Sequence, residues 1–185
     1  AVLRDEMDLI TNDQVDEWFE ENYNGLIERE HSYLQPHTKK IAREQVAKYV
    51  ENNHENWSLI KETEVDLIIE KEGYFLKGQI DLLKTTDNGV EILDFKAEQK
   101  PSPEKLGKEL YEQKIAQYRK QLQIYAHLVE QKFRIEVSGM KLYYTNTKEK
   151  NPYIIFEKND FAIDEMIDEF SSIVDQIQKK NFASR

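Results

Sequence analysis

The sequence predicts an α/β fold in which a central mixed β-sheet is flanked by helices. Apolar residues that alternate with polar ones, or run together briefly, predict strands at 65–69, 74–83 and 90–96. Apolar residues then recur every three or four positions from Leu110 to Phe133, which predicts one long helix with an inward face. Two more strands are expected at 137–144 and 153–156. The long helix therefore predicts a crossover that places 140–144 beside the strand at 90–96.

Length and composition predict one domain. The chain has 185 residues, of which 39% are hydrophobic and 34% are charged. We expect a single domain over 1–185, with a helical N-terminal part at 1–56 and a core of sheet and helices at 57–185. No apolar run approaches the roughly 20 residues of a membrane helix, so we expect no membrane partner and a cytoplasmic setting. Because cysteine is absent, disulfides and cysteine-ligated iron–sulfur clusters are excluded.

The two ends of the chain are expected to be helical. Ala1–Leu9 has a helical composition without a capping residue ahead of it, and Thr11 to Asp13 cap a second, short helix through Phe19. A third helix is expected at Pro36–Val50, and a final one begins near Asp160 as its N-cap. The uncapped start leads us to expect a C-terminal fragment of a longer protein.

The segment 78–96 carries a candidate site. Its two apolar runs are joined by Asp87-Asn88-Gly89, which favours a tight hairpin turn. An antiparallel register centred on this turn brings Asp81 opposite Asp94, or within one residue of it. Asp94 and Lys96 are two residues apart on one strand, so they point to the same face. The hairpin therefore predicts two carboxylates and one ammonium group at one end.

Two interpretations of this cluster are open on spacing alone. Two carboxylates at bonding distance repel each other unless a divalent cation lies between them, and hard oxygen ligands suit Mg²⁺ or Mn²⁺. Such a cation lowers the pKa of a bound water, and a nearby ammonium group can orient that water. The alternative is an exposed polar hairpin face on which Asp and Lys pair, which contributes little energy.

Three motifs resemble one family. Gly78-x-Ile80-Asp81, Asp94-Phe95-Lys96 and Gln121-x-x-x-Tyr125 resemble the PD-(D/E)xK nuclease superfamily, and most closely the RecB-type nuclease domains attached to UvrD/Rep-like helicases. That family has G-x-(I/V)-D, D-(F/Y)-K and Q-x-x-x-Y in this order, on a strand, a strand and a helix. The resemblance covers roughly 62–145 and, more loosely, the final helix. It implies a restriction-endonuclease-like fold and hydrolysis of DNA with Mg²⁺ or Mn²⁺.

The resemblance also implies a role for each motif residue. Asp81, Asp94 and the main-chain carbonyl of Phe95 would bind one cation, or two. Lys96 would position or activate the attacking water. Gln121 and Tyr125 lie one helical turn apart and would border the catalytic pocket. The implied partners are DNA and the helicase (ATPase) domains of the same parent chain.

The family places a further metal-binding histidine on a helix upstream of the two strands. Neither His31, His37 nor His54 matches that helix well, so we expect the family's histidine to precede Ala1, with His31 or His37 as the alternative. If cleavage requires this ligand, an isolated fragment that lacks it is expected to be inactive. Glu64 resembles a glutamate that the family carries ahead of its first strand, and we expect it to support the site without binding metal. Gly78 is expected to permit either a bulge or a close approach of substrate.

The charge is unevenly distributed. A net charge of −10 argues against nucleic acid at first sight, yet the segment 96–120 holds seven basic residues against four acidic ones. A second basic group comprises Lys39, Lys40, Arg43 and Lys48. The final helix is acidic and holds a predicted apolar stripe from Ile163 to Ile177, so we expect it to lie away from the site. A mixed, solvated surface explains the basic runs equally well.

Two functions compete with that of a nuclease. In the first, the chain is a catalytically impaired nuclease-fold module that binds DNA or a partner protein. In the second, it is a structural interaction module, and the charged hairpin has no chemical role. The complete set of Asp81, Asp94, Lys96 and Gln121 favours the enzyme, because a binding module does not require all four.

Overall fold

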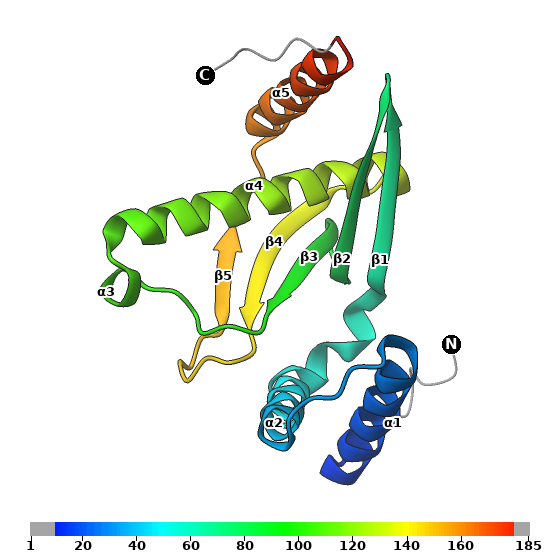
Figure 1. Ribbon diagram of the computed structural model, residues 1–185, viewed down its shortest axis with the longest axis vertical. Helices are drawn as coiled ribbons and strands as arrows, with labels where there is room; N and C mark the ends of the chain where they lie inside the picture. The colour runs from blue at the N-terminus through cyan, green and yellow to red at the C-terminus, as the bar shows by residue number, and fades with distance from the viewer. Residues whose placement is uncertain (1–9, 180–185) are drawn as a thin grey trace. The chain divides into compact units, whose positions relative to one another are not determined.

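The computed structural model describes residues 10–179, and Figure 1 shows its helices and strands. In chain order these are α1 (Asn12–Glu30), α2 (Pro36–Asn53), a 3-10 helix (His54–Leu59), β1 (Ile60–Lys71), β2 (Tyr74–Thr86), β3 (Gly89–Lys96), α3 (Pro103–Leu106), α4 (Lys108–Phe133), β4 (Val137–Tyr144), β5 (Tyr153–Phe156) and α5 (Asp160–Gln178). The described chain forms two compact units. We call residues 60–95, 100–143 and 153–179 the sheet unit, and residues 10–59, 96–99 and 144–152 the helical unit.

The sheet is mixed, as predicted. Its order is β1-β2-β3-β4-β5, and the pairs β1–β2, β2–β3 and β4–β5 are antiparallel. The β3–β4 pair is parallel, because Val90 N donates to Glu136 O (2.9 Å) at one end and Thr145 N donates to Lys96 O (3.0 Å) at the other. The long helix α4 makes the crossover between these two strands. The α/β class and the crossover predicted from the sequence are thus confirmed.

Helix α4 extends over the sheet from β5 to β1, as Figure 1 shows. Leu128 on α4 lies against Gly78 on β2, and the guanidinium of Arg119 lies 5.9 Å from the ring of Phe156 on β5. All buried residues of α4 lie in its second half, whereas its first half contains none, and Leu110 is 60% exposed. The predicted inward stripe therefore begins near Leu122. The prediction of one continuous helix holds from Lys108 onward, because Gly107, with φ 79°, separates α3 from α4.

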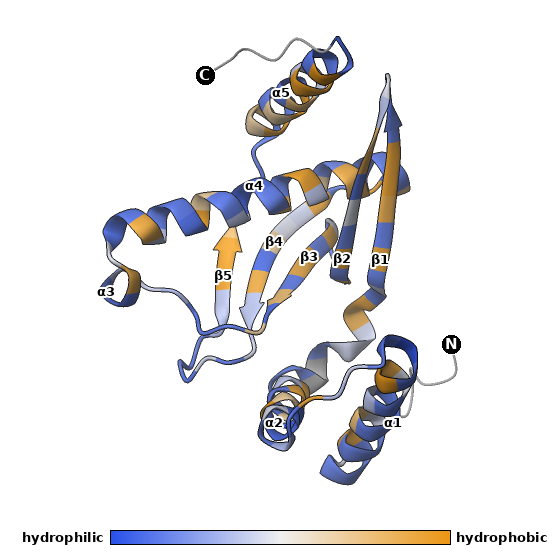
Figure 2. Ribbon diagram, in the orientation of Figure 1, coloured by the Kyte–Doolittle hydropathy of each residue, from blue (hydrophilic) through white to orange (hydrophobic). Residues whose placement is uncertain are grey.

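The core of the sheet unit consists of aliphatic residues from the strands and from α4. The fully buried members include Leu67, Ile80, Leu83, Ile92, Leu93, Leu122, Leu128, Met140 and Leu142. Figure 2 shows apolar colour concentrated in the strands, most evenly in β5, whereas α1 and α2 are largely hydrophilic. None of the helices described between residues 10 and 179 is long and apolar enough to cross a membrane.

The helical unit begins with a capping box. Thr11 Oγ1 accepts from Gln14 N (3.2 Å), and Gln14 Oε1 accepts from Thr11 N (2.9 Å), so two backbone N–H groups at the start of α1 are satisfied. The predicted start is confirmed, but the helix is not short, because it continues to Glu30. The helix predicted at Ala1–Leu9 lies outside the described residues.

Helix α5 differs from its prediction in two ways. Its N-cap is Asn159, whose Oδ1 accepts from Ala162 N (3.2 Å), and not Asp160. Ile163 and Met166 are buried as predicted, but Phe170, Ile173 and Ile177 are 39%, 46% and 54% exposed. The apolar stripe therefore packs at its N-terminal end and is open to solvent further along, because the described sheet unit offers no surface that covers it completely.

Candidate active site

The β2–β3 hairpin brings the predicted carboxylates together. Its main-chain pairs run from Thr86 opposite Gly89 to Leu82 opposite Leu93. The same register places Asp81 opposite Asp94, in agreement with the prediction. Gly89 is required at the turn, because its φ is 141° and an added Cβ would lie 2.2 Å from Glu136 O.

The Asp81 side chain continues the hairpin after the main-chain pairs end. Phe95 N donates to Asp81 Oδ2 at 2.6 Å. In an extended strand, the N–H and C=O of one residue point to the same side. The carbonyl of Phe95 therefore faces the side of Asp81 as well. One carboxylate and one main-chain oxygen are thus directed to the same place.

Asp94 is 5% exposed and lies beside the crossover helix α4. Gln121 Nε2 lies 3.4 Å from Asp94 Oδ1 and donates to the Tyr125 hydroxyl at 2.9 Å. The amide of Gln121 therefore bridges the carboxylate and the tyrosine. Three of the predicted site residues, from strand β3 and helix α4, make direct contact.

Gly78 has a different role from either predicted alternative. It pairs regularly with Leu67, so it does not form a bulge. A Cβ at this position would lie 2.9 Å from Leu128 Cδ1 and 3.0 Å from Tyr125 Cε1. The glycine therefore lets α4 pack closely on β2, and this close packing fixes the ring of Tyr125.

Lys96 is the last residue of β3 and belongs to the helical unit. Its carbonyl accepts from Thr145 N (3.0 Å) and lies 3.4 Å from Thr145 Oγ1. The same hydroxyl lies 3.0 Å from Gln45 Oε1 on α2. These contacts hold the backbone of Lys96. The sequence analysis did not identify Thr145 or Gln45, because no local pattern connects them to the hairpin.

Among the described residues, the two aspartates are not joined by further side chains into a group that could hold a metal ion. Among the side chains that the structure describes, which leave out those of residues 54 and 55, no group of three or more Asp, Glu or His could hold a cation. His31 is the exposed C-cap of α1, and His37 is exposed on α2. Glu64 lies between the pairs Thr63–Leu82 and Val65–Ile80, at the level of Asp81, with a left-handed φ of 49°. The candidate donors are therefore two carboxylates and one main-chain carbonyl, and oxygen donors of this kind fit Mg²⁺ or Mn²⁺.

A second charged cluster lies nearer the turn of the hairpin. Lys84 is 8% exposed and is paired in register with Glu91, which also forms an ion pair with Lys141. Burial lowers the pKa of Lys84, although the charge of Glu91 opposes this effect. The cluster holds two lysines against one glutamate and lies outside the acidic end of the hairpin.

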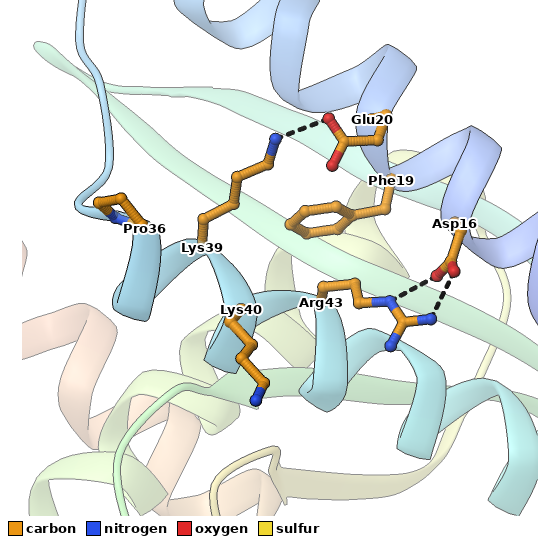
Figure 3. Close-up of a pocket in the computed structure, with 7 residues that line it drawn as sticks. All are labelled: Asp16, Phe19, Glu20, Pro36, Lys39, Lys40 and Arg43. Atoms are coloured by element: carbon orange, nitrogen blue, oxygen red, sulfur yellow. Dashed lines mark hydrogen bonds and ion pairs between the residues drawn. The ribbon is translucent and has the colours of Figure 1, made fainter.

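Most of the predicted basic side chains on α2 form ion pairs or hydrogen bonds within the helical unit. Figure 3 shows Arg43 donating to both oxygens of Asp16 (2.5 Å each) and Lys39 donating to Glu20 (2.6 Å) across a pocket of about 430 Å³ between α1 and α2. Hydrogen bonding to Asp16 raises the pKa of Arg43. Lys48 donates to Thr147 O at 2.5 Å. Lys40, by contrast, is exposed and makes a long contact of 3.9 Å with Glu44.

Helix α5 borders the candidate site, contrary to our expectation. Phe170 and Val174 line a cavity of about 560 Å³ together with Gln121 and Tyr125. The acidic composition of α5 predicted a distant position. The error arises because its apolar side chains, and not its carboxylates, line this cavity.

The fold and the hairpin together define an α/β protein of the restriction-endonuclease-like class. A sequence profile described as the PD-(D/E)XK nuclease superfamily matches residues 4–185, and the chain belongs to that superfamily. A crystal structure of a proposed exonuclease from Eubacterium rectale is 17% identical, with a TM-score of 0.59 over 96% of this chain and 70% of that one. The crystal structure of SSO0001 is 16% identical, with a TM-score of 0.42 over 86% of each chain. A search of curated protein sequences found no match.

Proposed function

We propose that this protein is a deoxyribonuclease that depends on Mg²⁺ or Mn²⁺ and hydrolyses the phosphodiester bonds of DNA. Asp81, Asp94 and the carbonyl of Phe95 would hold the cation. When bound, the cation would supply charge neutralisation at the scissile phosphate and a water of lowered pKa. The contact that carries this proposal is the hydrogen bond from Phe95 N to Asp81 Oδ2, because it directs a carboxylate and the Phe95 carbonyl to one place beside Asp94.

Lys96 and the Gln121–Tyr125 pair complete the proposed machinery. Lys96 follows Asp94 by two residues on the same strand, so its ammonium group would orient the attacking water near the phosphate. Gln121 contacts Asp94 and Tyr125, and it would hold the carboxylate in one rotamer. Tyr125 would in turn fix the amide of Gln121.

A finer assignment is that the protein is a RecB-type nuclease domain whose parent chain carries UvrD/Rep-like helicase domains and acts in DNA repair. What supports it is the order of the three motifs around Asp81, Asp94 and Gln121. We also propose that the chain acts in the cytoplasm, as the sequence analysis expects.

A second candidate function is DNA or protein binding without cleavage. The observation that favours it is the small donor set, because the described side chains include no group of three or more Asp, Glu or His that could hold a cation. Cleavage distinguishes the two functions, and affinity for Mn²⁺ distinguishes both from a purely structural module.

The test is cleavage of linear and circular DNA in Mn²⁺ and in Mg²⁺, followed on gels. We expect Asp94→Asn and Lys96→Ala to lower the cleavage rate by about a hundredfold or more, because each removes a group that acts on the reacting atoms. Asp87→Ala is the matched control, since it removes an exposed carboxylate from the turn of the same hairpin. Equal cleavage by all three variants and the wild type would mean that the activity does not come from this site.

A further inference from the structure

The first half of α4 carries a surface that the proposed function does not use. Figure 1 shows this half of the helix reaching beyond β5 toward α3. None of its residues is buried, and Leu110 is 60% exposed. At 3.6 residues per turn, Tyr111, Lys114, Tyr118 and Gln121 fall within an arc of about 80° around the helix axis. We call the first three of these residues the α4 stripe. The stripe therefore leads along one face of the helix to Gln121.

The α4 stripe ends at the candidate site. The amide of Gln121 lies 3.4 Å from the carboxylate of Asp94. Lys114 precedes Gln121 by seven residues, which is two helical turns and about 10 Å along the axis. All of these residues belong to the sheet unit. A ligand bound along the stripe would therefore extend to the proposed reaction centre.

The three side chains of the stripe are neighbours on the helix surface. The ammonium group of Lys114 lies 5.8 Å from the centre of the Tyr118 ring, where the face of an aromatic ring attracts a cation. Tyr111 and Lys114 are three residues apart, so their Cβ atoms are about 5–6 Å from each other. Each of the three side chains is partly exposed. The stripe therefore places one ammonium group between two phenol rings at the surface.

The charge around the stripe favours an anionic ligand. Residues 100–120 hold six basic residues against three acidic ones, in a chain with a net charge of −10. Two of the three acidic residues, Glu109 and Glu112, point away from the stripe on α4. There Glu109 Oε1 accepts from Gln113 Nε2 at 3.4 Å, and Glu112 Oε1 lies 3.8 Å from Lys108 Nζ. Within α4, which the structure describes in full, no carboxylate lies on the stripe.

A single strand of DNA offers both groups that such a surface binds. Its phosphates attract an ammonium group, and the flat faces of its bases stack on aromatic rings. A base inside an intact duplex is already stacked on its neighbours and cannot present its face to a protein surface. One lysine between two aromatic rings on a projecting helix therefore fits a single strand better than a duplex.

We propose that the α4 stripe binds a single strand of DNA beside the scissile phosphate, with Lys114 on a phosphate and Tyr111 stacked on a base. The proposal rests on the proposed nuclease function and extends it to the substrate. Because a DNA strand rises about 3.4 Å per nucleotide in B form, and more when it is extended, the phosphate at Lys114 lies about two or three nucleotides from the scissile one.

The test of the phosphate contact is binding at several KCl concentrations, with Ca²⁺ in place of Mn²⁺ so that cleavage does not interfere. A fluorescein-labelled single strand is titrated with each protein and followed by anisotropy. Lys114→Ala makes the dependence of log K on log salt shallower by about 0.7, the value of one phosphate contact on a single strand, and Lys114→Arg restores it. Lys120→Ala is the matched control, because it removes the same charge from an exposed position on the other side of α4.

The stacking contact has a different signature. Tyr111→Ala weakens single-strand binding about tenfold, which is the usual contribution of one stacked base, without a change in the salt dependence. Tyr111→Trp restores the affinity, and a duplex of the same length binds Tyr111→Ala as it binds the wild type. Phe161→Ala is the control for this variant, because Phe161 is an 86% exposed aromatic residue of α5.

The outcomes separate this proposal from the proposed nuclease function. The α4 stripe is rejected if Lys114→Ala has the same salt dependence as Lys120→Ala, or if Tyr111→Ala binds the single strand as tightly as Phe161→Ala does. Loss of both contacts in these variants, together with no Mn²⁺-dependent cleavage by the wild type, would retain the stripe and reject the nuclease. Cleavage that disappears in Asp94→Asn, with single-strand binding unchanged in Lys114→Ala and Tyr111→Ala, would reject the stripe alone.

Discussion

Asp81 has two tasks at the scale of a single residue. One of its oxygens accepts the N–H of Phe95 at 2.6 Å, and the carboxylate as a whole would bind the cation. The first task is structural, because it replaces the main-chain pair that would otherwise follow Leu82–Leu93. The second depends on negative charge. A substitution that keeps the acceptor and removes the charge separates the two.

We predict that Asp81→Ala lowers the free energy of unfolding by about 1.5–3 kcal/mol, because it leaves the Phe95 N–H without its charged acceptor. Asp81→Asn keeps an oxygen acceptor and should lose less. Both variants should lose affinity for Mn²⁺, because neither has the carboxylate. Urea unfolding measures the first effect and calorimetric titration with Mn²⁺ the second. An Asn variant that binds Mn²⁺ like the wild type would contradict the ligand role.

Gly78 connects the hairpin to the crossover helix at the scale of elements. The strand approaches α4 so closely that a methyl group would lie 2.9 Å from Leu128 Cδ1 and 3.0 Å from Tyr125 Cε1. Leu128 is fully buried, so it has little room to move. A change at Gly78 therefore moves Tyr125, and with it the hydrogen-bond partner of Gln121.

We predict that Gly78→Ala lowers the free energy of unfolding by about 1–3 kcal/mol through overpacking. It should also slow cleavage, because the displaced Tyr125 no longer fixes Gln121 beside Asp94. Gly25→Ala is the control, since Gly25 lies within α1 with no atom within 4 Å of the added Cβ. That variant should be as stable as the wild type or slightly more so. A Gly78→Ala protein with unchanged stability would show that α4 can shift without cost.

The elements that could be predicted from the sequence are those that depend on local chemistry. The turn at Asp87-Asn88-Gly89 determines the register of the hairpin, so the meeting of Asp81 and Asp94 followed from it. Gln121 and Tyr125 are one helical turn apart, so their contact also followed. The role of Gly78 could not be predicted, because its partners lie on a distant helix. The same holds for α5, whose apolar stripe indicates a buried face but not the element that covers it.

Charge distribution matters at the scale of the whole molecule. The net charge is −10, and the described cations Lys39 and Arg43 are already paired with acidic residues of α1. The overall negative charge therefore opposes long-range attraction of DNA. The proposed binding depends instead on a local cation at Asp81 and Asp94.

Global stability should depend on pH through His127 of α4. Burial lowers the pKa of His127 below its ordinary value of 6.5, and the nearby charge of Lys71 lowers it further, while Asp164 and Glu130 oppose the shift. Lys71 Nζ lies 3.1 Å from His127 Nε2, a contact that suits a neutral ring with an accepting nitrogen. The folded state therefore resists protonation at this position.

The sign of the effect follows from proton linkage. Above pH 6.5 the ring is neutral in both states, and the contact contributes fully to stability. As the pH falls below 6.5, the imidazole of the unfolded chain takes up a proton, whereas that of the folded chain stays neutral. The free energy of unfolding therefore decreases until the pH has passed the lower pKa of the folded state. We predict that His127→Gln reduces this decrease, whereas His37→Gln, at an exposed position of α2, does not. Urea unfolding between about pH 8 and pH 5 measures the slopes. Parallel slopes for the wild type and His127→Gln would place the pH dependence elsewhere in the chain.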